Sequence, residues 1–575
     1  MFKLLYFCKP YRWSLIPLVF ATFLQTFGQL LIPFYTANII NNGVIPGDID
    51  YIISTGILML FIALIAGLAS IYAVYLSSKL SALLGRDLRQ AVFSKSTTLT
   101  VPQFKHFGAS SLITRSTNDI NQITMLYSWS LQFLLPGPLL AIGGFALALS
   151  RDVTLTIVLF TTVLIISIAS YIICIKAVPL FMKLQPKMDS INRLLRELIT
   201  GVRVIRAFNA QKNEQQRFEK TAQEYAQIAI KINKIFAYYV PIIILTMNLG
   251  MVAILWFGGI GLSTGNVQIG DIMAIIEYSV YIMTSVMMMS FVLFYIPRVE
   301  ISAKRINEII EMEASNNDAS VTVTDFNSDI NIIEFKDVEF SYPNAEKPVL
   351  KNINFTAKKG ETIALVGTTG SGKSTLVSLI PRFYEITQGE ILLNGVNISQ
   401  IPLKNLREKI GFVTQKPFIF SGTIKDSLHF GKPDANQSEI DHAIKLSQAF
   451  DFVQQKGINE IVSQEGINLS GGQKQRLSIA RAIIRKPEIY IFDDSFSALD
   501  YKTDKNLRTA LKNEVKNTIY FIVAQRISTI KNADKILVLD QGEIVALGSH
   551  KTLINTCEIY KNFATTQMNE SELLA

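Results

Sequence analysis

The stretch from Gly367 to Thr375 has residue types and spacing that suit the binding of a polyphosphate. It matches the pattern G-x-x-x-x-G-K-[ST], in which glycines let the backbone wrap closely around an anion. The lysine of this pattern would reach the β- and γ-phosphates, and the following hydroxyl would bind Mg²⁺. The residues of the pattern are Gly367, Thr368, Thr369, Gly370, Ser371, Gly372, Lys373, Ser374 and Thr375.

The flanking residues supply the elements that such a loop needs. Residues 362–366 form an apolar run of strand length, and residues 376–380 read as the first turns of a helix. Further on, residues 489–493 form a second apolar strand that ends in Asp493, a carboxylate suited to Mg²⁺ in a protein with such a loop. Short apolar runs alternate with helical patterns from residue 331 to residue 565, which predicts an α/β domain.

A different composition marks the first half of the chain. The protein has 575 residues and is 49% hydrophobic, with the excess placed before residue 300. Each of six apolar runs reaches the ~20 residues that a membrane-spanning helix requires. Residues 1–12 predict a short amphipathic segment on the membrane surface. The six predicted spans are residues 13–40, 52–77, 129–150, 153–178, 238–262 and 270–296.

The positions of Lys and Arg predict the orientation of these spans. Residues 41–51 and 263–269 contain neither, whereas the connections 79–128 and 179–237 are rich in both. The positive-inside rule therefore places the long connections and the N-terminus in the cytoplasm. The net charge of +9 is interpreted as contact with anionic lipid, not with nucleic acid. The three cysteines are far apart and have no spacing typical of a metal site.

These features predict four parts of the chain. Residues 1–300 form a transmembrane domain with six spans and two long cytoplasmic stalk loops, and Pro297 is expected to close the last span. Residues 301–330 are a linker, residues 331–565 are the α/β domain, and residues 566–575 are a polar tail.

A third motif points to a family. Residues Leu469, Ser470, Gly471, Gly472 and Gln473 precede a helical stretch, and here the chain resembles the ATPase domain of ABC transporters. With six preceding spans, the whole chain resembles an ABC exporter half-transporter. Its motifs follow the order of the family: Tyr342, the phosphate loop, Gln415, the signature 469–473, Asp493, and a segment ending in Asp500.

The resemblance implies ATP and Mg²⁺ as cofactors, with a role for each motif. Tyr342 would stack on adenine, and Gln415, Asp493 and Ser374 would bind Mg²⁺. In the family, the signature faces the γ-phosphate held by the other subunit, so two chains enclose each ATP. The stretch 197–208 resembles the one that leads to the second coupling helix, which docks on the partner's ATPase domain.

Two positions depart from the family pattern. Asp494 stands where the family has a catalytic Glu, and Gln525 stands where it has a His that contacts the γ-phosphate. The side chain of Asp494 is one methylene shorter than that of Glu, and the amide of Gln525 is neutral. Both differences predict slow hydrolysis of ATP at this site. Because the signature at 469–473 is intact, these two departures favour one subunit of a heterodimeric exporter whose partner is non-identical. A homodimeric lipid or drug exporter that tolerates Asp494 and an ATP-gated, non-transporting membrane regulator remain alternatives.

The transported substrate is the least defined feature of the sequence. Glu277 lies inside the sixth apolar run, where an ionisable residue is a functional-site hypothesis; its alternative is a position in water near the outer end. The aromatic and Met content favours a small amphipathic drug, and lipid, peptide and porphyrin cargo remain open. The family resemblance suits a multi-pass protein of a bacterial plasma membrane, with its ATPase domain in the cytoplasm.

Overall fold

The computed structural model describes residues 2–312, 329–343, 345–514 and 517–567. It divides into two compact units. The helical unit consists of residues 1–98 and 107–312, and the α/β unit consists of residues 99–106 and 313–575. Most of the predicted linker, residues 313–328, and the end of the predicted tail, residues 568–575, lie outside the described residues.

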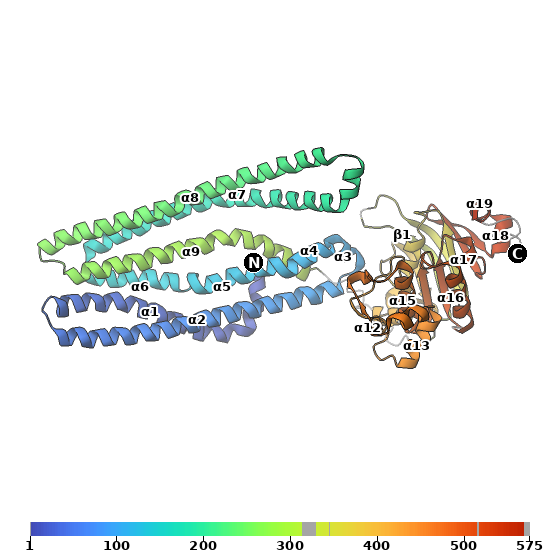
Figure 1. The fold of residues 1–575 in the computed structure, drawn as a ribbon, viewed down its shortest axis with the longest axis horizontal. Coiled ribbons are helices and arrows are strands. Elements are labelled where there is room, and N and C mark those ends of the chain that lie inside the picture. Colours follow the sequence, from blue (N-terminus) through green and yellow to red (C-terminus); the bar gives the residue numbers. More distant parts are fainter. Residues whose placement is uncertain (1, 313–328, 344, 515–516, 568–575) are drawn as a thin grey trace. The chain divides into compact units, whose positions relative to one another are not determined.

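Long helices make up the helical unit (Figure 1). Among the described residues, six helices are long and apolar enough to cross a membrane, and each contains one predicted span. The longest has 55 residues, about 80 Å at 1.5 Å per residue, far more than a bilayer crossing needs. The elements are η1 Phe2–Ser14, α1 Leu15–Ile39, η2 Ile40–Val44, α2 Ile49–Thr98, α4 Ala109–Thr114, η3 Arg115–Asp119, α5 Ile120–Trp129, η4 Ser130–Leu134, α6 Pro136–Arg151, α7 Val153–Ala207, α8 Gln211–Ser263 and α9 Ile269–Ile310.

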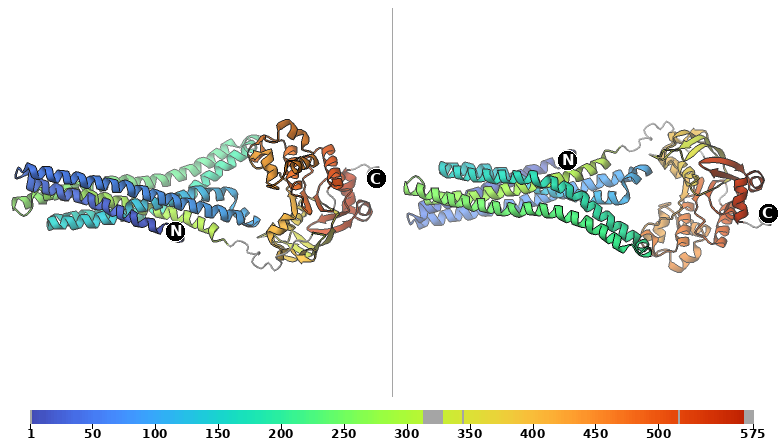
Figure 2. Two further views of the ribbon diagram at one scale, coloured as in Figure 1. Left: turned by 90° about the horizontal axis from the view of Figure 1, so that it is seen from below. Right: turned by 90° about the horizontal axis from the view of Figure 1, so that it is seen from above.

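The helices of this unit pack in pairs. Helices α1 and α2 run side by side, as do α7 and α8, and α6 packs on α9 (Figures 1 and 2). Small residues permit the close approach: a Cβ atom at Gly28 of α1 would lie 2.6 Å from the Cβ of Ala66 of α2. Helix α9 continues through Pro297, the predicted end of the last span, to Ile310. Val292 and Val299, which flank Pro297 in sequence, are both buried in one core cluster of this unit.

Two sheets form the centre of the α/β unit. Within the described residues, six strands are ordered β12-β11-β3-β10-β9-β6 and four are ordered β2-β1-β4-β5. The strands are β1 Ile332–Phe340, β2 Leu350–Lys358, β3 Thr362–Gly367, β4 Gln388–Leu393, β5 Val396–Asn397, β6 Ile410–Val413, β7 Gly422–Thr423, β8 Ile461–Val462, β9 Ile489–Asp493, β10 Ile519–Val523, β11 Lys535–Asp540 and β12 Glu543–Gly548.

Helices cover these sheets, and short β7 and β8 pair with each other. The helices are α3 Val101–Phe107, α10 Lys373–Leu379, η5 Ile398–Gln400, α11 Leu403–Glu408, α12 Ile424–His429, α13 Gln437–Leu446, α14 Phe450–Lys456, η6 Gln464–Gly466, α15 Gly471–Ile483, α16 Tyr501–Glu514, α17 Ile527–Ile530, α18 His550–Thr556 and α19 Glu558–Gln567.

The parallel strands of the six-stranded sheet are buried on both faces, whereas the antiparallel edge strand β12 is not. In β3, Ile363 and Leu365 belong to a core shared with the four-stranded sheet and α10, whereas Ala364 and Val366 belong to a core under helices α12 to α16. Continuous apolar strands are typical of such parallel sheets. The predicted fold class, six membrane-type helices followed by an α/β ATPase-type domain, is confirmed.

Candidate nucleotide-binding and hydrolysis site

The site lies where four parallel strands end. Strands β3, β10, β9 and β6 are neighbours, and their register aligns Val523 of β10 with both Leu365 of β3 and Asp493 of β9. The loops that follow them therefore meet at one edge of the sheet, where α/β proteins bind ligands. This register brings together the phosphate loop and the segments that carry Gln415, Asp494 and Gln525.

Glycine is required at the start of the phosphate loop. A Cβ atom at Gly367 would lie 2.1 Å from the carbonyl oxygen of Leu539 in β11, and Gly372 has a φ of 99°. The Nζ of Lys373 donates hydrogen bonds to the carbonyl oxygens of Gly367 (2.9 Å) and Thr368 (2.7 Å). Burial lowers the pKa of Lys373, and the carboxylates of Asp493 and Asp494 oppose this shift. The backbone of the phosphate loop thus folds around the amino group of Lys373.

Ser374 and Asp493 form the part of the site that suits Mg²⁺. The Oγ of Ser374 donates a hydrogen bond of 2.7 Å to Oδ1 of Asp493. Burial raises the pKa of Asp493, as does nearby Asp494, and both Ser374 and Lys373 oppose the rise. Among the described residues no cluster of three or more His, Cys, Asp or Glu could hold a metal ion. One hydroxyl and one carboxylate fit Mg²⁺, which takes one or two protein carboxylates together with phosphate oxygens.

Asp494 joins the two glutamines of the site. Its Oδ2 accepts hydrogen bonds from Nε2 of Gln415 at 3.2 Å and from Nε2 of Gln525 at 3.3 Å. Its backbone has a φ of 47°, a left-handed conformation in which Asp is among the better tolerated residues. Burial raises the pKa of Asp494, and the hydrogen bond from Gln415 and the charge of Lys373 oppose this.

The signature residues form the start of helix α15. Ser470 caps the helix in a capping box: its Oγ accepts from the backbone N–H of Gln473, whose side chain accepts from the backbone N–H of Ser470. Leu469 is buried, whereas Ser470 and Gly471 are exposed, and a Cβ atom at Gly471 would meet nothing within 4 Å. The helix N-terminus is open to an anion from outside.

Of three other predicted residues, Tyr342 contacts the phosphate loop, whereas Asp500 and Glu277 lie elsewhere. Tyr342 follows β1, and its hydroxyl is hydrogen bonded to Oγ1 of Thr375 at 3.0 Å. Asp500 caps α16 by accepting from the N–H and hydroxyl of Thr503. Glu277 is half-buried in α9 of the helical unit. In the described part of the α/β unit, no hydrogen bond or ion pair joins the signature to the phosphate loop.

A residue that the sequence interpretation missed holds the segment after β10. Nε2 of Gln567, at the end of α19, donates to the carbonyl oxygen of Gln525, and its Oε1 accepts from the N–H of Ile527, both at 2.9 Å. Gln567 thus fixes the backbone on both sides of Arg526. A glutamine in a polar C-terminal stretch gives no signal of this contact, because the partner lies 40 residues or more earlier.

The comparisons with known proteins agree with this architecture. A family model described as ABC transporter transmembrane region matches residues 15–286. A second model, described as ABC transporter, matches residues 350–497. An uncharacterized ABC transporter ATP-binding protein of Mycobacterium tuberculosis is 38% identical over 564 residues, covering 97% of each chain. Another from Bacillus subtilis is 34% identical over 569 residues, covering 99% of this chain and 98% of that protein.

Two further matches differ in what they show. An ATP-dependent lipid A-core flippase of Chromobacterium violaceum is 31% identical over 536 residues, covering 93% of this chain and 91% of that protein. A solved bacterial Atm1-family ABC exporter with ATP bound matches with a TM-score of 0.84, covering 97% of this chain and all of that one; at 23% identity it supports the fold alone. The chain belongs to the ABC transporter family, as an ATP-driven exporter subunit in which a multi-pass membrane domain precedes an ATP-binding ABC ATPase domain.

Proposed function

We propose that this chain is the degenerate-site subunit of a heterodimeric exporter. It binds ATP at its own phosphate loop, hydrolyses it slowly, and lends its signature to a competent site in a non-identical partner. The observation that carries the proposal is the pair Asp494 and Gln525 beside an intact signature at 469–473.

The environment of Asp494 supports slow hydrolysis. Its carboxylate is one methylene shorter than that of Glu, and a displacement of about 1 Å can cost about 10²-fold in rate. Oδ2 already accepts from both Gln415 and Gln525. A neutral amide at Gln525 also stabilises developing negative charge less than a charged imidazole does.

The same site retains the groups that bind nucleotide. Lys373 and the loop amides would hold the phosphates, Ser374, Asp493 and Gln415 would hold Mg²⁺, and Tyr342 would stack on adenine. The bound Mg²⁺ would neutralise charge on the phosphate oxygens. In this account ATP stays in this site and holds the two ATPase domains together while the partner's site turns over.

An exposed aromatic cluster offers a docking surface for the partner. Phe418, Phe420 and Phe430 are 50%, 46% and 64% exposed, and the first two follow Gln415 closely in sequence. Their rings pack together, with centroids 5.1 Å and 4.6 Å apart. We assign this surface to the partner's second coupling segment, since the corresponding stretch 197–208 of this chain ends in Phe208, itself 79% exposed.

The proposed cargo is a small amphipathic drug, including cationic ones. Glu277 lies eight residues into α9, about 12 Å along the helix axis from Ile269. It is not on the packed face, where Tyr278 and Ile282 are buried; it shares a face with exposed Met273 and Val280. A carboxylate there would favour cations. Met283, by contrast, is buried in the helix core, so it serves packing.

One alternative has specific support. The similarity to a lipid A-core flippase favours lipid as the cargo, as in the alternative of a homodimeric lipid exporter that tolerates Asp494. The ATP-gated regulator has no observation of its own in its favour. In either case we place the protein in a bacterial plasma membrane, with its N-terminus and ATPase domain in the cytoplasm.

Two matched variants in one chain test the proposal. In the co-purified pair, Asp494→Asn removes the candidate base of this chain's own site, retains the groups that hold ATP, and should leave at least half of the Mg-ATPase rate. Gly471→Glu places a carboxylate at the signature, where the structure has room for it, and should abolish the rate. Gly471→Ala is the control for folding. If Asp494→Asn stops turnover as completely as Gly471→Glu, this chain's own site is catalytic and the proposal fails.

A further inference from the structure

A groove runs between the N-terminal segment and helix α2 of the helical unit. Its volume is about 770 Å³, and it lies between η1 and the part of α2 that follows the predicted second span. Aromatic and charged side chains line it together, which distinguishes it from a purely apolar packing surface. Those that matter for its chemistry are Tyr6, Lys9, Arg12, Trp13, Asp87 and Gln90.

Other side chains of η1 anchor it to α2. Leu4 is buried in a core cluster with Leu88 of α2, and Tyr11 packs against a second cluster that contains Leu80. The hydroxyl of Tyr11 also donates a hydrogen bond of 2.6 Å to Oδ2 of Asp87. The walls of the groove are therefore held in place by contacts within the chain, and the groove needs no ligand to form.

The negative charge at the groove is already compensated. Asp87 forms an ion pair with Arg86, whose Nε lies 2.8 Å from Oδ1, and its Oδ2 accepts from Tyr11. Nη2 of Arg86 also donates to the hydroxyl of Tyr11 at 2.8 Å, which joins the three groups in one network. Both carboxylate oxygens of Asp87 thus have partners, and Asp87 does not cancel the other charges of the groove.

The positive charge of the groove is not compensated. Within the described part of the helical unit, Lys9 and Arg12 form no ion pair. Each lies over an aromatic ring, Lys9 at 5.4 Å from the centre of Tyr6 and Arg12 at 5.4 Å from the centre of Trp13. Because η1 is a 3₁₀-helix, side chains three residues apart eclipse, so Lys9 and Arg12 are on the same side of it. This pair of cations favours an anionic ligand.

An exposed apolar stripe follows the groove along helix α1. Four large apolar side chains recur there every three or four residues, so they share one face of the helix, and all are exposed. Trp13 precedes the stripe by three residues, and the chain has no Lys or Arg between Arg12 and Lys79. A ligand whose charge lies in the groove can therefore place hydrocarbon chains against α1. The residues of the stripe are Ile16, Phe20, Phe23 and Phe27.

We propose that this groove binds an anionic phospholipid of the cytoplasmic leaflet, with its phosphate on Lys9 and Arg12 and its acyl chains along the stripe. The choice of leaflet rests on the cytoplasmic N-terminus proposed above, and not on the heterodimer. A glycerol headgroup can form hydrogen bonds with the amide of Gln90. The ammonium of ethanolamine or choline is instead repelled by the two cations. The groove therefore selects phosphatidylglycerol over zwitterionic lipids.

Trp13 lines the groove, so its fluorescence reports occupancy. Trp129→Phe and Trp256→Phe leave it as the only tryptophan of the full-length chain, which is reconstituted in phosphatidylcholine vesicles. Rising fractions of phosphatidylglycerol or phosphatidylethanolamine with brominated acyl chains are compared as quenchers. Phosphatidylglycerol should reach half-maximal quenching at a mole fraction about 10-fold lower or less, since each basic residue at an anionic lipid contributes about 5-fold.

Charge variants of η1 separate a site from general attraction to an anionic surface. Lys9→Gln and Arg12→Gln should each lower the preference for phosphatidylglycerol about 5-fold. Lys3→Gln is the matched control: it removes the same charge from η1, but Lys3 is paired with Glu311 and does not line the groove. An equal loss in Lys3→Gln overturns the proposal. Equal quenching by both lipids, or quenching by neither, overturns it as well.

A second measurement needs no tryptophan substitution. The wild-type chain, extracted in mild detergent and analysed by native mass spectrometry, should retain phosphatidylglycerol, and the double variant Lys9→Gln/Arg12→Gln should lose it. Glycerol 3-phosphate in solution should not displace the retained lipid, because it has no acyl chains for the stripe on α1. Displacement would mean that a soluble phosphate ester is the ligand, and retention by the double variant would mean that the lipid binds elsewhere; either result refutes the proposal.

Discussion

Restoring the family residues at the two degenerate positions should convert this chain into an active ATPase. Asp494→Glu extends the carboxylate by one methylene toward the position that a general base requires. A catalytic group misplaced by about 1 Å can lower the reaction rate about 10²-fold. Restoring the length of the carboxylate should therefore raise kcat of the purified chain about 10²-fold. Gln525→His adds a group that can carry positive charge, and the double variant should gain at least a further ~10-fold.

The local cost of the change is small enough for the protein to fold. Glu is less favoured than Asp at a φ of 47°, which costs about 1 kcal/mol. The two long hydrogen bonds from Gln415 and Gln525 contribute about 1 kcal/mol each at most. Together these losses are below the 5–15 kcal/mol by which a domain is typically stable, so a gain in rate should be observable.

The assay is release of phosphate by the purified chain at saturating Mg-ATP. Adding Lys373→Ala to the double variant should return the rate to baseline, because the phosphates lose their cation. Gly471→Glu should do the same, because each site needs a signature from the other copy. An unchanged kcat in Asp494→Glu, with normal ATP binding, would refute the reasoning that carboxylate length limits this site.

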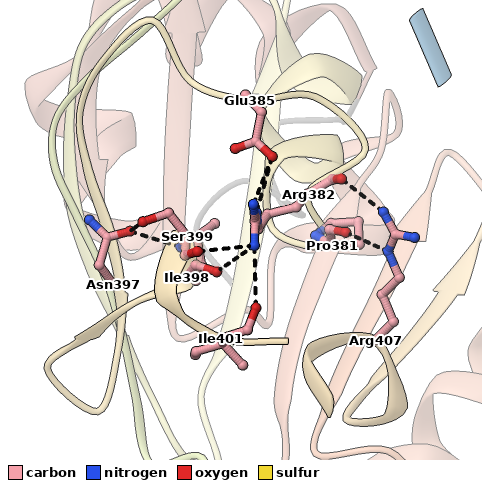
Figure 3. A network of polar contacts seen from close by, with 8 residues as sticks. All are labelled: Pro381, Arg382, Glu385, Asn397, Ile398, Ser399, Ile401 and Arg407. Carbon is pink, nitrogen blue, oxygen red and sulfur yellow. Dashed lines mark hydrogen bonds and ion pairs between the residues drawn. The ribbon is translucent and has the colours of Figure 1, made fainter. Parts of the chain in front are cut away.

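Three other perturbations test separate contacts. Gln567→Ala removes both hydrogen bonds around Arg526, and in the activated double variant it should lower kcat about 10-fold, since each bond contributes roughly 0.5–1.5 kcal/mol; an unchanged rate would show that the segment keeps its position without them. Arg382→Met leaves several buried carbonyl oxygens unpaired (Figure 3) and should destabilise the ATPase domain by about 3 kcal/mol, measured as a fall of roughly 6–12 °C in its thermal transition, with Lys404→Gln, at an exposed lysine of α11, as control; a fall under about 2 °C would contradict this. Glu277→Gln should weaken export of cationic substrates from vesicles and leave neutral ones unaffected, and equal effects on both would reject a substrate role.

Local patterns were enough to predict the elements that carry the site. The phosphate loop lies between β3 and α10, and the strand predicted at 489–493 is β9 residue for residue. Such segments are defined by their own glycines and apolar runs, so their structure follows from neighbouring residues. The six apolar runs are equally local and each lies in one long helix.

Contacts between distant segments could not be predicted in this way. The convergence of Gln415 and Gln525 on Asp494 depends on strand register, and the contact of Gln567 depends on how α19 packs. Neither the register of the strands nor the packing of α19 can be inferred from a local window of sequence.

The Mg-ATPase rate of the purified chain, alone and co-expressed with a candidate partner half-transporter, tests the central claim most directly. We predict little activity alone, a strong increase with the partner, and loss of that increase in Gly471→Glu of this chain. Turnover by the chain alone at the rate of the pair would contradict the account, because it would mean that Asp494 is a competent base.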